Sequence, residues 1–342
     1  MADGAVDDNQ IVSRSLKAAS ISRIVELAQE HCTAEQWGEW LRTPLELAAA
    51  DGDKQLTVEL ALAGASGDPI SEAIRAGQHD VVRHLRQEPE HHHLELALEV
   101  GDEAMVSLLL ELGADADPED HWQYDKLYLT PIHLAAKAGQ AGIVGLLMDA
   151  GADADRPAGK DETTWEERCN EECNIVQTEC ALHFGAIGGH VDVIKEIARR
   201  EPSIVNSVAE STGYTALHYA AKHSQLGSID ALVQAGVDIN AQGGVGSGTA
   251  LHAAVSSPDC EATLLALLGY GANVDRTTTD STTTPLLSAV KAGNLCAANI
   301  LVLAGADIAL PLFFASAHKS SSEMVVTLLG RGGDANPKQR FF

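Results

Sequence analysis

The chain has 342 residues, enough for two globular domains or for one elongated array. Its 23 basic and 49 acidic residues give a net charge of −26, which argues against binding to nucleic-acid phosphates and favours basic protein partners. No segment approaches the roughly 20 apolar residues of a membrane-spanning helix. The acidic start, "MADGAVDDNQ", resembles neither a signal peptide nor a transit peptide.

The composition also indicates how the core is built. Hydrophobic residues make up 45% of the chain but aromatic residues only 4%, so the core consists mainly of Ala, Leu, Val and Ile. This favours thin, closely stacked helices. Six cysteines spread over this length do not suggest a disulfide framework. We therefore expect reduced thiols in a cytoplasmic or nuclear protein.

Residues 1–42 form the first predicted element. The stretch "SRSLKAASISRIVELAQEHCTAEQWGEWLR" within them reads as a helical N-terminal cap. Its Trp37 and Trp40 are expected to shield the segment that follows.

From residue 43 onward the sequence repeats. "TPIHLAAKAG" at Thr130 returns as "TALHYAAKHS" at Thr215 and "TALHAAVSSP" at Thr249. Units of this kind start near residues 43, 68, 92, 130, 180, 215, 249, 284 and 310. In seven of them a closing glycine lies 21 or 22 residues after the start, namely Gly64, Gly113, Gly151, Gly236, Gly271, Gly305 and Gly332. Each such unit therefore has a fixed body, and the connectors vary in length, as in stacked repeats with insertions on one face.

The body reads as two short helices. Thr130 supplies an N-cap hydroxyl, and Pro131 suits the first helical position. Gly139 ends the first helix, and a second helix with Ile143 and Leu147 on its apolar side runs to Gly151. Two helices of this length cannot bury an apolar face alone, so neighbouring units must pack together.

These motifs, together with the closures "GADAD", "GVDIN" and "GANVD", resemble the ankyrin repeat, from Thr43 to about Gly333. The resemblance implies an all-α solenoid of about nine helix-turn-helix units with β-hairpin or loop fingers and a concave groove. The array is assigned to residues 43–333, and residues 334–342 form a truncated or frayed tail. The units that start at Asp68 and Cys180 depart from the pattern, because each ends in Glu-Pro instead of a glycine closure.

Two long connectors flank the best-formed repeat and predict enlarged fingers. Between Glu111 and Asp125 there are six acids and no Lys or Arg, and between Asp153 and Glu179 nine acids and three bases. The first finger also holds three of the nine Trp and Tyr residues in the chain. Aromatic side chains ringed by polar groups are typical of binding hot spots. The alternative is that the rings fold back on their own finger. The residues expected to contact a partner are Asp117, Asp120, Trp122, Tyr124 and Trp165.

The histidines have structural and functional interpretations. The motif residues His133, His183, His218 and His252 recur once per unit along the array, so they are predicted to hydrogen-bond at helix starts and not to converge in a catalytic site. "EPEHHHLEL" could bind a metal through His91, His92 and His93, but assigning His92 and His93 to the Thr and Pro places of the motif explains two of them.

Two further stretches also have alternative interpretations. Cys169, Cys173 and Cys180 near His183 could ligate zinc, but residues 163–176 fit an amphipathic helix that starts with a capping box and uses cysteine as a small hydrophobe. In "LVQAGVDIN", Asn240 matches the spacing that asparaginyl hydroxylases favour in ankyrin repeats, although repeat structure alone explains the same residues. "NAQGGVGSGT" lacks the spacing and lysine of a phosphate loop and reads as a flexible finger.

The sequence therefore predicts a non-enzymatic scaffold or adaptor that binds a protein through its fingers and concave face. The expected ligand is a basic, partly apolar segment, with no catalytic residues, cofactor, metal, nucleic acid, membrane or small-molecule substrate. The alternative is the targeting part of a larger enzyme or ubiquitin-ligase assembly. A third possibility is a metal-regulated binder that uses the segment between Cys169 and Cys180.

Overall fold

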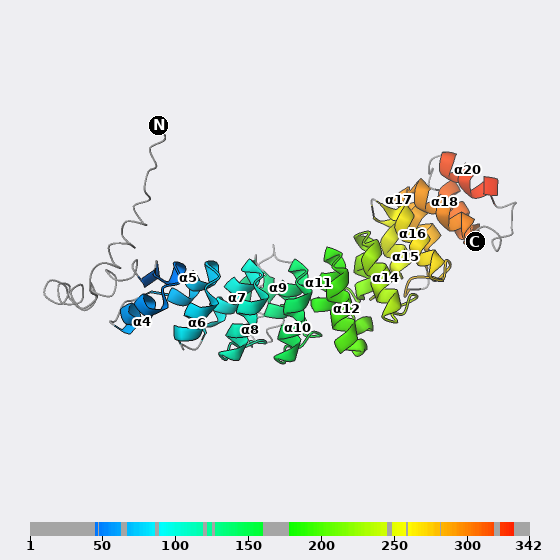
Figure 1. The fold of residues 1–342 in the computed structure, drawn as a ribbon. Helices are drawn as coiled ribbons and strands as arrows, with labels where there is room; N and C mark the ends of the chain where they lie inside the picture. Colours follow the sequence, from blue (N-terminus) through cyan, green and yellow to red (C-terminus); the bar gives the residue numbers. More distant parts are fainter. Residues whose placement is uncertain are drawn as a thin grey trace, which may run out of the picture. The chain divides into compact units, whose positions relative to one another are not determined.

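The computed structural model describes residues 45–46, 48–62, 67–85, 89–118, 122–124, 127–159, 178–244, 248–257, 259–280, 282–317 and 322–331. The described chain is mostly helical (Figure 1). It divides into two compact units, Met1–Pro118 and Glu119–Phe342, which are treated separately below. The predicted N-terminal cap and C-terminal tail lie outside the described residues.

The described part of unit 1 consists mainly of short helices, beginning with helical residues 45–46 and 48–50. After these come α4 (Lys54–Leu62), α5 (Pro69–Arg75), α6 (His79–Leu85), α7 (His91–Val100) and α8 (Glu103–Glu111). The first helices of successive pairs, α5 and α7, pack on each other, while α6 packs between α4 and α8. Their shared core holds fully buried Leu60, Ile74, Leu94, Met105 and Leu109. As the sequence predicts, a pair begins at Asp68, whose carboxylate caps α5 by accepting the Ser71 N–H at 3.1 Å.

Unit 2 begins with a β-hairpin and continues as helix pairs. Strand β1 (Trp122–Tyr124) is antiparallel to β2 (Leu127–Leu129), with Trp122 opposite Leu129, so the first long connector contains a hairpin. The helices that follow are α9 (Pro131–Ala138), α10 (Ala141–Asp149), α11 (Ala181–Gly188), α12 (Val191–Arg200), α13 (Ala216–Lys222), α14 (Leu226–Gln234), α15 (Ala250–Val255), α16 (Cys260–Gly269), α17 (Pro285–Ala292), α18 (Leu295–Leu303), α19 (Ala309–Ala317) and α20 (Ser322–Arg331). A 3₁₀ helix, η1 (Pro202–Asn206), follows α12.

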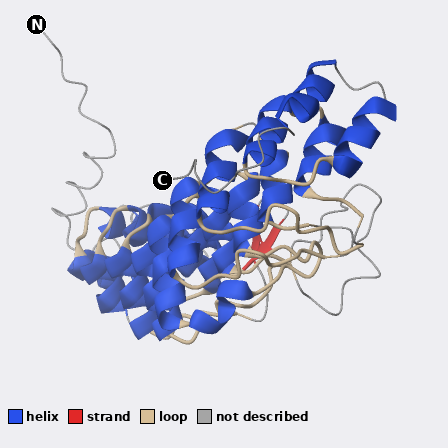
Figure 2. Cartoon of the chain, turned by 90° about the vertical axis from the view of Figure 1, so that its right-hand side faces the viewer, coloured by secondary structure: helices blue, strands red, loops and turns tan. Residues whose placement is uncertain are grey.

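The helices of unit 2 stack in two rows. The first-helix row contains α9, α11, α13, α15, α17 and α19, and the second-helix row contains α10, α12, α14, α16, α18 and α20. Buried alanines such as Ala135, Ala186, Ala220 and Ala254 allow close approach within the first-helix row. The connectors (tan) and the hairpin (red) lie outside the helices (blue) in Figure 2.

Glycine geometry confirms the predicted helix ends. The closing residues Gly151, Gly236 and Gly305 have φ values of 98°, 87° and 90°, in the left-handed region where glycine has no Cβ penalty. Gly139 ends α9 at φ 78° in the same way. After α12, by contrast, Glu201 has φ −136° and leads directly into η1. This fits the Glu-Pro ending that sets this unit apart in the sequence.

One sequence assignment was wrong. His92 and His93 do not occupy the Thr and Pro places, because α7 begins at His91 and its N-cap is Glu90. The Glu90 N–H donates to Nδ1 of His93 at 2.9 Å, which is the contact that the motif histidine makes in the other units. Helix α7 has ten residues, whereas α9 has eight. The repeat therefore starts two residues earlier than counting back from its closing glycine predicts. His93 is therefore the motif histidine of its unit.

Candidate functional site

The expected contact residues fall in different parts of the structure. Asp117 is half-buried in unit 1, and its N–H donates to the Asp115 carboxylate at 3.0 Å. Trp122 and Tyr124 belong to strand β1 of unit 2. Asp120 and Trp165 lie outside the described residues, as do Cys169 and Cys173. The candidate surface is therefore built below from residues of unit 2.

The motif histidines join successive helix pairs in unit 2. Each accepts the N–H of its N-cap residue on Nδ1, as His133 does from Thr130 at 3.1 Å. The proton therefore lies on Nε2, which donates to a backbone carbonyl of the next connector. The acceptors are Arg156 at 2.9 Å from His133, Ser207 at 3.2 Å from His183, Gly248 at 3.0 Å from His218 and Thr283 at 3.1 Å from His252. The predicted structural role of these histidines is thereby confirmed.

Burial disfavours the charged form of three of these histidines. It lowers the pKa of His183 to about 4 and also lowers the pKa values of His218 and His252. Cys180 takes the threonine place, with its Sγ 3.0 Å from Nδ1 of His183. Both side chains are almost fully buried, and burial raises the pKa of the Cys180 thiol to about 12. This pair has the composition of a nucleophile and base but neither the exposure nor the ionisation that catalysis requires.

A second set of bonds runs along the connectors of unit 2. The side-chain oxygens of Asn206, Asn240 and Asp275 accept the backbone N–H of the next connector, from Asp238 at 2.8 Å, Asn273 at 2.7 Å and Asp307 at 2.8 Å. We call this set the Asx ladder. It gives half-buried Asn240 a structural hydrogen bond.

The histidine cluster of unit 1 is also held by hydrogen bonds. Asp68 lies 2.8 Å from Nε2 of His92 and 2.9 Å from Nε2 of His93, so three possible metal ligands come together. However, Nδ1 of His93 accepts the Glu90 N–H, which places the proton on Nε2 and removes the lone pair that a metal would need. Burial alone would raise the pKa of Asp68, but hydrogen bonds from His93, His92 and Ser71 outweigh it and hold that pKa well below its usual range.

A groove of about 400 Å³ lies between the connectors and the first-helix row of unit 2. The ring of Tyr214 on its wall stacks on His218, with centroids 5.0 Å apart. Gly248 lets the connector lie directly on the His252 ring, since a Cβ there would come within 2.2 Å of it. Its lining comprises Tyr214, Lys222, Gly248, His252, Ala253, Ser256, Thr278, Thr283 and Ser288. Sequence reasoning missed this groove because each of these residues has an ordinary structural interpretation within its own unit.

Charge is separated around this groove. Helices α9, α11, α13, α15, α17 and α19 contain no Asp or Glu, and Lys137, Lys222 and Lys291 recur at equivalent positions on three of them. The described acids of unit 2 lie instead on the second-helix row and the connectors. Those on the connectors include Asp153, Asp155, Glu179, Glu210, Asp238, Asp275, Asp280 and Asp307. The first-helix row is therefore a basic stripe within a strongly acidic chain. We refer to it as the lysine stripe.

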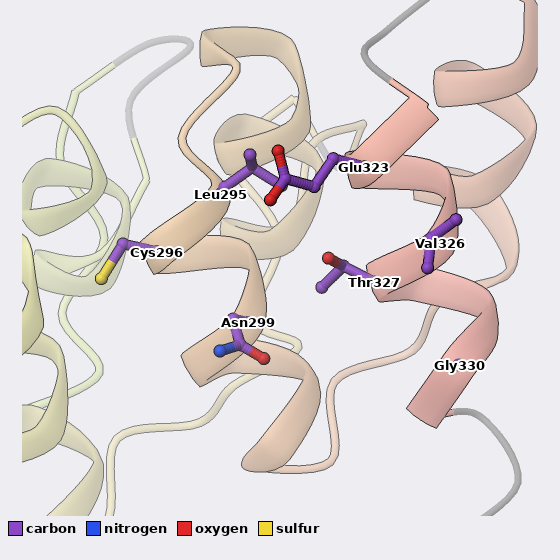
Figure 3. Close-up of a pocket in the computed structure, with 7 residues that line it drawn as sticks. All are labelled: Leu295, Cys296, Asn299, Glu323, Val326, Thr327 and Gly330. Atoms are coloured by element: carbon purple, nitrogen blue, oxygen red, sulfur yellow. The ribbon is translucent and has the colours of Figure 1, made fainter.

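A larger hollow of about 480 Å³ lies between α18 and α20 (Figure 3). Glu323 and Thr327 of α20 face Leu295 and Asn299 of α18, while the sulfur of Cys296 points away from α20. That thiol lies 4.0 Å from a carboxylate oxygen of Glu261 on α16. With one acid and no base in its lining, this hollow offers fewer polar groups to a ligand than the groove along the lysine stripe.

Comparisons with known proteins agree with the repeat pattern. Residues 163–243 match the family described as "Ankyrin repeats (3 copies)", and residues 128–158 match "Ankyrin repeat". The chain is 34% identical over 127 residues to the nuclear factor NF-kappa-B p105 subunit of Gallus gallus, covering 37% of this chain and 13% of that protein. It is 29% identical over 175 residues to the B-cell lymphoma 3 protein homolog of Mus musculus, covering 48% of this chain and 38% of that protein.

The chain thus spans well under half the length of these curated relatives. Every helix in the described ranges is too short or too polar to cross a lipid bilayer. Paired helices, left-handed closing glycines, histidine bridges and the matching repeats lead to the same conclusion. The chain contains ankyrin repeats, within residues 128–158 and 163–243.

Proposed function

We propose that this protein is a non-enzymatic scaffold that binds a protein segment through its connectors and first-helix row. The single observation that carries the proposal is the groove of unit 2, whose lining combines a stacked aromatic ring with hydroxyls and the lysine of α13. The histidine bridges and the Asx ladder hold this lining in place, so the surface is organised before binding. Preorganisation lowers the entropy lost when a partner binds.

The proposed partner segment is basic and partly apolar where it meets the connectors. Acids concentrate there, and Trp122 and Tyr124 lie two residues apart on β1 of the hairpin. The contact residues that we propose are Asp117, Asp120, Trp122, Tyr124 and Trp165. We further propose an array of about nine units over residues 43–333, with two enlarged fingers, in a cytoplasmic or nuclear protein.

Proximity labelling followed by pull-down tests the proposal. We expect the double variant Trp122→Ala/Tyr124→Ala to lose at least about three-quarters of the partner recovered by the unmodified chain, because aromatic anchors typically contribute 2 kcal/mol or more. The matched control is Tyr270→Ala, which removes an exposed tyrosine on the second-helix side of unit 2. Equal recovery by all three proteins would show that the hairpin is not the contact.

A further inference from the structure

The lysine stripe and the groove beside it carry an inference that rests on the proposed function. The connectors and the first-helix row have opposite charge, so one binding segment meets acids on one side and lysines on the other. Exposed Lys222 lines the groove together with the hydroxyls of Ser256 and Ser288. Helices α13, α15 and α17, which supply this floor, carry no carboxylate.

A second lysine lies at the edge of the same groove. The Lys291 ammonium donates to the Thr283 hydroxyl at 3.2 Å and lies 5.7 Å from the ring centroid of Phe314. Both contacts hold its charge beside the groove lining. The nearby acid is Asp280, which accepts the Thr278 hydroxyl and the Thr282 N–H, the latter at 3.1 Å. The hydrogen bond from Thr278 and those from Thr282 lower the pKa of Asp280, and the charge of Lys291 adds a smaller contribution. Asp280 therefore forms its hydrogen bonds within its own connector.

The remaining lining residues shape the groove without adding charge. His252 uses both ring nitrogens, one for the Thr249 N–H at 2.9 Å and one for the Thr283 carbonyl at 3.1 Å. Burial lowers its pKa, so it forms a neutral wall. Tyr214 presents an aromatic surface beside it. Single lysines with hydroxyls suit a singly charged carboxylate, whereas a doubly charged phosphate is typically held by clustered arginines.

We propose that this groove binds the carboxylate of an Asp or Glu side chain in an extended partner peptide, with Lys222 as its main ionic contact and Lys291 as the second. The partner segment is then charge-segregated. Its basic residues face the acidic connectors, and its acidic residue faces the lysine stripe. The chain has a net charge of −26, so long-range electrostatic attraction does not favour an acidic ligand. Binding of an acidic residue therefore requires the local positive charge of this groove.

A displayed library of random 12-residue peptides, selected on the immobilised full chain, tests this. We expect the pool selected by the unmodified chain to contain Asp or Glu at a defined position, and the Lys222→Glu pool to replace it with Lys or Arg. A selected peptide should bind Lys222→Gln about fivefold more weakly, and replacing its acid by the matching amide should remove that difference. Lys291→Gln should produce a smaller loss.

The matched control is Lys195→Glu, which makes the same charge change on exposed α12 of the second-helix row. It should leave the selected pool unchanged, and circular dichroism should show the same helix content in all variants. A pool with no enrichment of any kind would overturn the proposed function itself. Enriched peptides that lack an acid, or that bind Lys222→Gln and the unmodified chain equally, would overturn only the carboxylate site.

Discussion

The two units use the motif histidine in opposite directions. In unit 2 each histidine donates forward to a neutral carbonyl of the next connector, as His218 does to Gly248 at 3.0 Å. In unit 1, His93 donates backward to the ionised carboxylate of Asp68, in the preceding helix pair, at 2.9 Å. In both units Nδ1 accepts the N-cap N–H, which requires a neutral ring, so the two units differ in the group that accepts the Nε2 proton: a backbone carbonyl in unit 2 and a carboxylate in unit 1. The acceptor in unit 1 is itself titratable, whereas the carbonyl acceptors of unit 2 are not.

The largest expected difference between the two units is the stability that each loses at acidic pH. In unit 2 the His183 pKa falls from 6.5 unfolded to about 4 folded, so below pH 6.5 the unfolded state binds a proton that the folded state does not. Stability is then lost as pH falls from 6.5 to 4, by about 3 kcal/mol for this histidine alone. Asp68 stays ionised over the same range because its folded pKa lies well below its usual value.

Hydrogen exchange measured by mass spectrometry can follow both units at once. Peptides from α11 and α13 should lose protection between pH 6.5 and 4 after correction for intrinsic rates, while peptides from α5 and α7 keep theirs. The variant His183→Gln, whose amide can accept and donate at similar positions without titrating, should flatten the response of unit 2. An equal loss of protection in both units would contradict the expected difference in their response to acid.

Removing the hydrogen bond from a motif histidine of unit 2 to the next connector should have the next largest effect on stability. His218→Ala leaves the Thr215 N–H and the Gly248 carbonyl without this partner in a buried region, and we expect a loss of about 3 kcal/mol. Urea unfolding followed by circular dichroism measures it. Exposed His223, which follows α13, is the control, and its replacement by alanine should cost under about 0.5 kcal/mol. Similar losses in the two variants would show that the bridge has no special contribution.

Removing the backward acceptor should cost less, because Asp68 is only partly buried. Asp68→Asn keeps one oxygen but presents an N–H₂ group to the two histidines that donate to the carboxylate. We expect a loss of about 1–2 kcal/mol at neutral pH, measured as faster hydrogen exchange in α5 and α7. Replacing Asp80, an exposed acid on α6, by Asn provides the control. Unchanged protection in Asp68→Asn would show that the hydrogen bond from His93 to Asp68 does not stabilise unit 1.

The smallest effect is expected at the N-cap of α11. Cys180→Thr restores the usual residue beside His183 and should change stability by under about 0.5 kcal/mol in either direction. In the unmodified chain, mass spectrometry after alkylation should find exposed Cys296 modified well before buried Cys180. Rapid alkylation of Cys180 under native conditions would show that this cap opens.

Local patterns predicted the helix pairs well, because Thr-Pro starts and closing glycines each have one dominant physical use. They failed at His92 and His93, where Glu90 replaced threonine as the N-cap and α7 grew by two residues relative to α9. They also could not show the groove, since Lys222, Ser256 and Ser288 come from three successive helix pairs and meet only through stacking. A repeat sequence predicts the helix pair of each repeat better than the surface that several stacked pairs form together.

The Asx ladder has a mechanical consequence. Asn206, Asn240 and Asp275 each tie one connector to the next by a single short bond, at 2.8, 2.7 and 2.8 Å. Tension applied along this edge would load these links in series, and each could open without releasing its neighbours. Unit 2 should therefore lengthen under pulling in small, reversible steps, as a spring with separate coils does, and should recoil when the load is removed.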